Sequence, residues 1–267
     1  MSITDINDKR KDQKPIEFIS NFELLQQIKQ QPETELFKID TFPTLTNYLE
    51  GGFEGEELVV ISGPGGHGKT LFCQTLTKDL CNNGHVPLWF PFEGSKKQFI
   101  SRFARSAEDL NFMMPKELTP FNISLLCESI RQAKDLYETE IVFIDNLHYL
   151  FDISYTKNVS LDIGSIMRKL KLLAIELGIV IFIICHTQKA RIESADDVGA
   201  HSIRDSSFIS QESDIILFIW CNIKEDGAIL KSSQFLKVCK SRRTGLMFKT
   251  ILVTKVGNYL AEQEPYL

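Results

Sequence analysis

Residues 62–70 decide the fold: they read SGPGGHGKT and fit the pattern G-x-x-x-x-G-K-T. An apolar run, residues 57–61, comes directly before them, and residues 69–82 have the character of a helix that ends just before a glycine. Glycines let successive backbone N–H groups turn toward phosphate oxygens, and a helix that begins there adds partial positive charge. The pattern therefore predicts a phosphate-binding P-loop. A glycine-rich turn without chemistry is the alternative.

Two side chains in this stretch can act on a bound triphosphate. Lys69 would reach the β and γ phosphates, and Thr70 would offer its hydroxyl group to Mg²⁺. The residues expected to surround the nucleotide here are Gly63, Pro64, Gly65, Gly66, His67, Gly68, Lys69, Thr70 and Leu71. The predicted cofactors are therefore ATP and Mg²⁺.

A magnesium ion at a P-loop needs an acidic ligand, and Asp145 is the candidate. It follows the apolar run 141–144, and the carboxyl ends of parallel strands face the same crevice as a P-loop. Because the next residue is Asn146, where many P-loop ATPases carry a glutamate, the base that activates water must lie elsewhere. Glu93 fits, since it ends the strand PLWFPF, which we expect near the P-loop strand. The alternative is that Glu93 only caps the segment GSKKQF.

His186 and Gln188 lie in the segment IICHTQK, at the end of a further apolar strand. That position again faces the expected crevice, where a polar group can bond the γ phosphate and report its loss to the following loop. The alternative for His186 is a strand-end histidine bonded to nearby backbone.

The rest of the chain predicts an α/β fold. The expected strands are residues 57–61, 87–92 and 141–144, followed by IVIFIIC, DIILFIW, FLKVCK and FKTILVTK. Residues 162–177 place apolar side chains on one helical face. Continuous apolar strands indicate a parallel sheet buried on both faces. We therefore expect a mostly parallel central sheet flanked by helices, with the last two strands as an antiparallel edge hairpin.

The composition excludes several classes of protein. A chain of 267 residues with 43% hydrophobic residues can bury the core of one large α/β domain. Its net charge of -5 gives no overall basic field. The longest apolar run is too short to cross a bilayer, and the six cysteines form no C-x-x-C pair. We expect a soluble, cytoplasmic protein with reduced thiols and no membrane partner.

Basic residues gather near the carboxyl end. Residues 227–261 contain seven Lys and Arg residues and no Asp or Glu. In a chain that is acidic overall, this block predicts one locally positive surface that suits a phosphate or a nucleic acid. The alternative is a solvated strand edge that lysines protect from pairing.

Together these motifs resemble one family. FPTLTNYLEGGFEGEELVVISGPGGHGKT is similar to the entry of the motor domain of DnaB-type replicative DNA helicases, superfamily-four ring helicases related to RecA and KaiC. PFEGSKKQFISRF resembles their second-strand glutamate segment, and IVFIDNLHYL resembles their Walker B strand. SIRDSSFISQESDIILFIW is similar to the segment that contains their DNA-contacting loop, and KVCKSRRTG to their Lys-x-Arg motif. The resemblance covers about residues 36–260, in the family's order.

The resemblance implies a RecA-like fold and roles for individual residues. Glu93 would be the catalytic base, Asp145 the acid that orders Mg²⁺, and Gln188 the polar switch. Lys240 and Arg242 would contact the ATP of a neighbouring subunit, where Arg242 would be the finger that stabilises transition-state charge. The residues expected to touch single-stranded DNA are Arg204, Asp205 and Ser206.

The same resemblance implies a homo-oligomer, a hexameric ring, that hydrolyses ATP at subunit interfaces, translocates on single-stranded DNA and unwinds duplex during replication. It would work in the cytoplasm, at the nucleoid or at a viral replication site. Two alternatives stay open. One is a RecA- or KaiC-like ATPase that acts in recombination or regulation without unwinding, and the other is a nucleotide-binding adaptor without enzymatic activity.

Three features depart from the family, and one is that Asn146 and His148 replace the commoner residues after the Walker B acid. Residues 1–34 are expected to be an extension with a possible linker helix, in which apolar residues repeat at helical spacing, whereas residues 35–267 form the motor domain. Family members usually carry an amino-terminal domain there. The predicted helix either docks on the next subunit, as the family's linker helix does, or has no such role. Ser207 and Phe208 stand where the DNA loop usually has glycine, which would alter the approach of the backbone to DNA.

Overall fold

The amino-terminal part of the chain forms a unit of its own. The structure is a computed structural model that describes residues 18–30, 35–103, 110–117, 122–150, 159–187, 198, 202–203, 206–223, 229–247 and 249–263. It divides into two compact units, Met1–Thr34 and Glu35–Leu267. The first contains helix α2, Asn21–Gln30, which buries none of its residues. Ser20 and Glu23 form a capping box, in which Glu23 N donates to Ser20 Oγ and Ser20 N donates to Glu23 Oε2. The helix that the apolar spacing predicts is therefore present.

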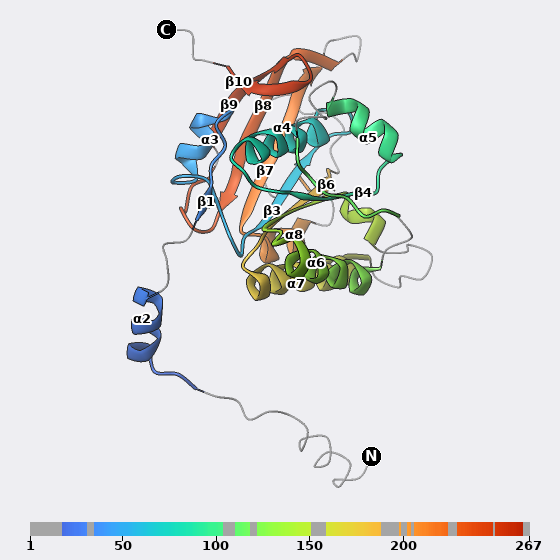
Figure 1. The fold of residues 1–267 in the computed structure, drawn as a ribbon. Coiled ribbons are helices and arrows are strands. Elements are labelled where there is room, and N and C mark those ends of the chain that lie inside the picture. Colours follow the sequence, from blue (N-terminus) through green and yellow to red (C-terminus); the bar gives the residue numbers. More distant parts are fainter. Residues whose placement is uncertain are drawn as a thin grey trace. The chain divides into compact units, whose positions relative to one another are not determined.

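The second unit is built around an eight-stranded sheet in the described part of the chain (Figure 1), with the order β10-β9-β8-β7-β3-β6-β5-β4. The parallel strands are β3 Leu58–Gly63, β4 Leu88–Pro91, β5 Ile141–Asp145, β6 Val180–His186 and β7 Ile215–Ile223. The antiparallel strands are β8 Ile229–Ser241, β9 Lys249–Val256 and β10 Tyr259–Glu262. The predicted fold class is confirmed, and β10 adds one strand to the expected edge hairpin.

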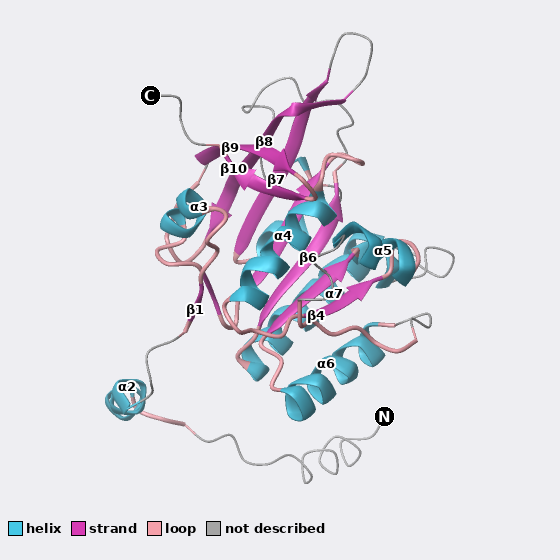
Figure 2. Cartoon of the chain, turned by 45° about the horizontal axis from the view of Figure 1, so that its top comes forward, coloured by secondary structure: helices cyan, strands magenta, loops and turns pink. Residues whose placement is uncertain are grey.

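Helices cover both faces of the sheet, as Figures 1 and 2 show. Alternate residues of β3 point to opposite faces: Val59 and Ile61 pack in the core with α4, and Leu58 and Val60 pack in the core with α6 and α7. Both faces are therefore dry, which explains why the central strands read as continuous apolar runs. The helices of this unit are α3 Pro43–Tyr48, α4 Lys69–Asn82, α5 Lys96–Phe103, α6 Ile123–Tyr137, α7 Val159–Leu177 and α8 Ser206–Glu212.

Smaller elements complete the second unit. Strands β1, Leu36–Phe37, and β2, Phe53–Glu54, pair antiparallel, and a short 3₁₀ helix, Leu147–Leu150, follows β5. None of the six cysteines forms a disulfide bond, and all but Cys81 are buried. Among the described residues, no helix combines the length and the apolar character that crossing a bilayer requires.

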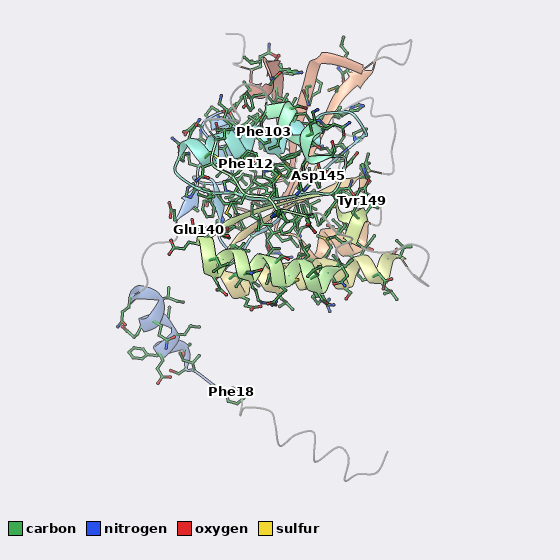
Figure 3. The ribbon with its side chains drawn as sticks, turned by 45° about the vertical axis from the view of Figure 1, so that its right-hand side comes forward. Phe18, Phe103, Phe112, Glu140, Asp145 and Tyr149 are labelled. Carbon is green, nitrogen blue, oxygen red and sulfur yellow. The ribbon has the colours of Figure 1, made fainter. Side chains whose placement is uncertain are left out.

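One expected position is wrong. The sequence predicts that the strand before Glu93 lies near the P-loop strand, but β4 is the edge strand and both β5 and β6 separate it from β3. The reason is that strand order depends on crossover connections and on later strands, which no local pattern encodes. All five parallel strands still end on the same side, so their polar end residues share one crevice. Figure 3 shows Asp145 and Glu140 at opposite ends of β5, which identifies the direction of these strands.

Candidate functional site

The P-loop lies between the end of β3 and the start of α4. Gly63 has φ +151° and Gly68 has φ +97°. A Cβ at Gly63 would overlap the carbonyl oxygen of Ile219 on β7, and one at Gly68 would lie 2.5 Å from Gln234 Nε2 on β8. Both positions therefore require glycine, because the loop is pressed against two neighbouring strands.

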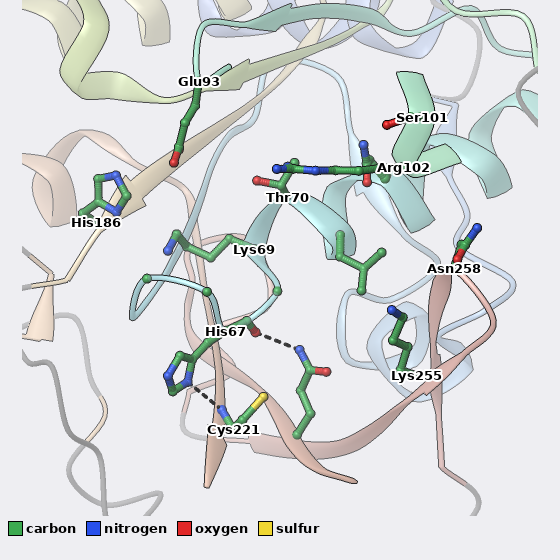
Figure 4. Close-up of a pocket in the computed structure, with 16 residues that line it drawn as sticks. His67, Lys69, Thr70, Glu93, Ser101, Arg102, His186, Cys221, Lys255 and Asn258 are labelled. Carbon is green, nitrogen blue, oxygen red and sulfur yellow. Dashed lines mark hydrogen bonds between the residues drawn. The ribbon is translucent and has the colours of Figure 1, made fainter. Parts of the chain in front are cut away.

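The His67 side chain braces this loop. The Nδ1 atom of the ring accepts a hydrogen bond of 3.0 Å from the backbone N–H of Cys221. The backbone carbonyl oxygen of His67 accepts one of 2.8 Å from Gln234 Nε2 (Figure 4). Burial lowers the pKa of His67, and the nearby charge of Lys69 lowers it further. A neutral imidazole suits the acceptor role of Nδ1. The side chain thus helps to fix the shape of the loop, and His67 also lines the pocket.

Lys69 is held over the loop. Its Nζ donates to the carbonyl oxygens of Gly63 at 2.8 Å and of Pro64 at 2.9 Å. The residue is buried, and burial lowers its pKa. A phosphate oxygen can replace either carbonyl as the acceptor, so the ammonium group is in place for a triphosphate.

Thr70 and Asp145 form a candidate site for Mg²⁺. Thr70 Oγ1 donates to Asp145 Oδ2 at 2.7 Å. Burial raises the pKa of Asp145 to about 6, against the lowering effect of this hydrogen bond. The other oxygen, Oδ1, is buried and accepts no hydrogen bond from the described residues. A buried carboxylate oxygen without a donor, beside a hydroxyl group, fits a hard cation that prefers oxygen ligands.

Glu93 and His186 meet on the amide of Asn146, which follows β5. Glu93 Oε2 accepts a hydrogen bond of 3.0 Å from Asn146 Nδ2, and His186 Nε2 lies 3.1 Å from the same nitrogen. Three neighbouring strand ends therefore place the predicted base, the predicted γ-phosphate contact and an amide within one hydrogen-bonded group.

Lys69, Thr70, Glu93 and His186 line a cavity of about 500 Å³. Figure 4 shows Lys69, Glu93 and His186 toward one side of it and Lys255 and Asn258 toward the other. The lining residues that the sequence reasoning missed are Gln74, Ser101, Arg102, Cys221, Gln234 and Asn258. Arg102, on α5, is the most relevant because its positive charge lowers the pKa of Asp145. No local pattern marks it, since α5 meets the pocket only through the tertiary fold.

Lys240 and Arg242 lie far from this pocket. Lys240 Nζ donates to the carbonyl oxygens of Ser210 and Ser213 at 2.6 Å each, at the end of α8. Arg242 donates to Asp214 Oδ1 at 2.9 Å and to the carbonyl oxygen of Gln211 at 2.7 Å. We call these two cations and their partners on residues 210–214 the basic edge.

Strand β8 joins the pocket to the basic edge. Gln234, near the middle of β8, contacts the P-loop, whereas Arg242 directly follows the carboxyl end of the strand, where its backbone N–H donates to the carbonyl oxygen of Asp214. Eight residues at about 3.3 Å each separate the two by about 26 Å. Neither Lys240 nor Arg242 can therefore reach a nucleotide in the pocket of its own chain.

The expectation of one positive surface over residues 227–261 is wrong for two members. Lys237 is buried and donates to the carbonyl oxygen of Val198. Arg243 pairs with Glu57 and Glu54. Successive strand residues face opposite sides of a sheet, so a block of charge in the sequence is divided among several environments.

A sequence model of the family described as "DnaB-like helicase C terminal domain" matches residues 111–255. The chain belongs to this family. The predicted recognition of a DnaB-type motor domain is thereby confirmed.

Curated relatives of this DnaB-like chain are replicative helicases. The replicative DNA helicase DnaB of Rickettsia conorii is 24% identical over 210 residues, which cover 63% of this chain and 42% of that protein. The corresponding helicase of Rickettsia prowazekii is also 24% identical over 210 residues, covering 63% of this chain and 43% of that protein. The match thus spans less than half the length of these relatives.

Solved structures show the same fold for this DnaB-like chain. One of them, described as an ATPase domain, aligns with a TM-score of 0.74 and 18% identity, covering 93% of this chain and 100% of that chain. A DnaB-like replicative helicase, described with its interactions with primase, aligns with a TM-score of 0.69 and 18% identity, covering 98% of this chain and 71% of that one.

Several predicted residues fall outside the described part of this DnaB-like chain. These are Gln188, Arg204 and Asp205. Ser206 is the first residue of α8, but its side chain is not described. The roles predicted for these four residues therefore stay predictions.

Proposed function

We propose that this protein is an ATP-dependent DNA helicase motor. The observation that carries the proposal is the pocket at the carboxyl end of the parallel sheet, where Lys69, Thr70, Asp145, Glu93 and His186 converge around the P-loop. Membership of the DnaB-like family supports the choice of helicase over other P-loop ATPases.

Each pocket residue has a defined part in hydrolysis. Lys69 stabilises the charge that develops on the transferred phosphate, Glu93 accepts the proton of the attacking water, and His186 bonds the γ phosphate. Thr70 and Asp145 would hold Mg²⁺, which would supply positive charge to neutralise the triphosphate.

The site needs a second copy of the chain to be complete. Because Arg242 lies about 26 Å and Lys240 about 20 Å along β8 from the P-loop contact, they serve the ATP of a neighbouring subunit. This supports a ring or filament, and we propose a hexameric ring around single-stranded DNA. The exposed apolar residues of the α2 segment, Phe18, Phe22, Leu25 and Ile28, support docking of this helix on another subunit. The proposed place of action is a replication site in the cytoplasm, at the nucleoid or in a virus-infected cell.

A strand-displacement assay on forked DNA tests this function. With ATP and Mg²⁺, the protein should separate forks that carry a 5′ or a 3′ single-stranded tail, and Lys69→Ala protein should separate neither. Closed rings should be visible by negative-stain microscopy. Hydrolysis without strand separation, together with open filaments, would instead support a RecA- or KaiC-like ATPase.

A further inference from the structure

The amide of Asn146 is the centre of a small polar group at the end of β5. Asn146 is only 1% exposed, although it sits beside the open pocket. Its Nδ2 lies 3.0 Å from Glu93 Oε2 and 3.1 Å from His186 Nε2. An amide nitrogen carries two hydrogens, so it can donate to both neighbours at once.

The orientation of this amide is determined by a third contact. The backbone N–H of His148 donates to Asn146 Oδ1 at 3.0 Å. A flipped amide would place its oxygen against the carboxylate of Glu93 and its NH₂ group against the N–H of His148, and both contacts would be repulsive. With the amide nitrogen as donor, Nε2 of His186 is the acceptor, and the neutral ring carries its proton on Nδ1.

The strand order explains why Asn146 reaches both partners. β5 lies between β4, which leads to Glu93, and β6, which ends at His186. The main chain of Glu93 is also tied to β5, because its N–H and that of Phe92 both donate to the carbonyl oxygen of Asp145, at 3.1 and 2.7 Å. An exposed glutamate at a sheet edge is thus held by its backbone and by its side chain.

We propose that Asn146 is a positioning residue for ATP hydrolysis, which fixes the base Glu93 and the γ-phosphate contact His186 relative to each other. It holds one oxygen of the Glu93 carboxylate. The other, Oε1, accepts no hydrogen bond from the described residues and is left for the attacking water. This inference rests on the proposed hydrolysis of ATP at the same pocket.

The matched pair Asn146→Asp and Asn146→Ala tests the proposal. Aspartate keeps the shape of the side chain and an acceptor for the His148 N–H, but it lacks the NH₂ group that holds Glu93 and His186. Both variants should lower kcat by about 10- to 100-fold, as expected when a reacting group is misplaced by about 1 Å. The KM for ATP and the affinity for a non-hydrolysable ATP analogue should stay unchanged, because the P-loop contacts remain.

A purely structural role gives a different result. If Asn146 only completes the turn before the 3₁₀ helix, Asn146→Asp should turn over ATP like the wild type, and that outcome overturns the proposal. A raised kcat would overturn it as well, because it would mean that Asn146 holds Glu93 in an inactive position. Thermal unfolding of both variants identifies loss of fold. If the Asn146→Ala variant does not fold, the Asn146→Asp variant alone tests the proposal.

A double-mutant comparison tests the link to His186. If the two residues act as one group, the loss of kcat in Asn146→Asp, His186→Ala protein should be smaller than the product of the two single losses. Independent, multiplicative losses would contradict the link.

Failure of this inference is distinguishable from failure of the proposed function. Wild-type protein that hydrolyses no ATP, with Mg²⁺ and single-stranded DNA present, refutes the proposed function. Wild-type protein that hydrolyses ATP beside an equally active Asn146→Asp variant refutes only the role of Asn146.

Discussion

The pocket and the basic edge lie at opposite ends of the same strands and differ in how complete they are. At the pocket, Lys69, Thr70, Asp145 and Glu93 come from three strand ends of one chain. Lys69 donates to P-loop carbonyl groups, Thr70 donates to Asp145, and the Asn146 amide donates to Glu93. At the basic edge, Lys240 and Arg242 contact only carbonyl oxygens and Asp214. One chain therefore assembles the groups that we propose bind the triphosphate and activate water. The two cations that we propose complete the charge stabilisation lie away from this pocket.

This difference explains why activity should depend on assembly. A single sheet can position the carboxylate and the lysine, whereas Arg242 lies about 26 Å along β8 from the P-loop contact, so we expect a neighbouring subunit to supply the finger. In the single chain, carbonyl oxygens and Asp214 hold the side chains of Lys240 and Arg242.

Of the substitutions that test this comparison, Arg242→Ala should have the largest effect on the turnover of ATP. Loss of the finger should lower turnover by about 10³-fold or more, with ATP affinity nearly intact. A mixture with Glu93→Gln protein should regain activity, because some interfaces then combine an intact pocket with an intact Arg242. Steady-state hydrolysis of the two proteins, alone and mixed, measures this.

The adjacent Arg243→Ala is the matched control, since Arg243 contacts Glu54 and Glu57 of its own chain. It should keep turnover per folded molecule. If the mixture of Arg242→Ala and Glu93→Gln stays inactive, the two ends of the sheet do not serve one shared site.

Lys69→Ala tests the pocket end. The variant should bind ATP weakly and lower turnover by about 10²- to 10³-fold, because a positive donor at the transferred phosphate is lost. Isothermal titration and hydrolysis assays give the two values. Substitution of the exposed Lys169 on α7 by alanine is the control and should leave turnover at the wild-type rate. If Lys69→Ala protein also hydrolysed ATP at the wild-type rate, the P-loop assignment would be refuted.

Asp214→Asn should loosen the basic edge. Asp214 is buried and accepts from Lys171 at 2.7 Å and Arg242 at 2.9 Å, so removal of its charge leaves two cations without their anion. We expect a loss of about 2 kcal/mol in the free energy of unfolding and a smaller loss of turnover than for Arg242→Ala. Denaturant unfolding measures the first quantity.

Glu212→Gln is the control for Asp214, because it removes a nearby but exposed ion pair with Arg168. Such a pair contributes at most about 1 kcal/mol. Equal destabilisation by the two substitutions would mean that Asp214 does not anchor Arg242.

Arg204→Ala should give the smallest effect. Arg204 precedes α8, whose last carbonyl groups bind Lys240 and Arg242. If it contacts a phosphate of single-stranded DNA, the substitution should weaken binding and reduce the slope of log affinity against log salt by about 1. Fluorescence anisotropy at several salt concentrations measures this slope, and an unchanged slope would count against the contact.

Local patterns predicted the elements of the motor unit well. The helix expected over residues 69–82 has those bounds in the structure, and the helix expected over 162–177 begins three residues earlier, at Val159. The carboxylate of Asp145 also meets Thr70 as expected from the end of its strand. These features depend on residues that are close in sequence or on one general rule about strand ends.

The sequence by itself determined the P-loop, the class of the fold and the kinds of groups at the strand ends, because glycine spacing and apolar periodicity are properties of contiguous residues. Only the tertiary structure decided that β4 is an edge strand, that Arg102 lines the pocket, and that Asn146 joins Glu93 to His186. Contacts such as that of Gln234 with the carbonyl of His67 join residues 167 positions apart. They arise from the order in which strands pack, which is a property of the whole chain.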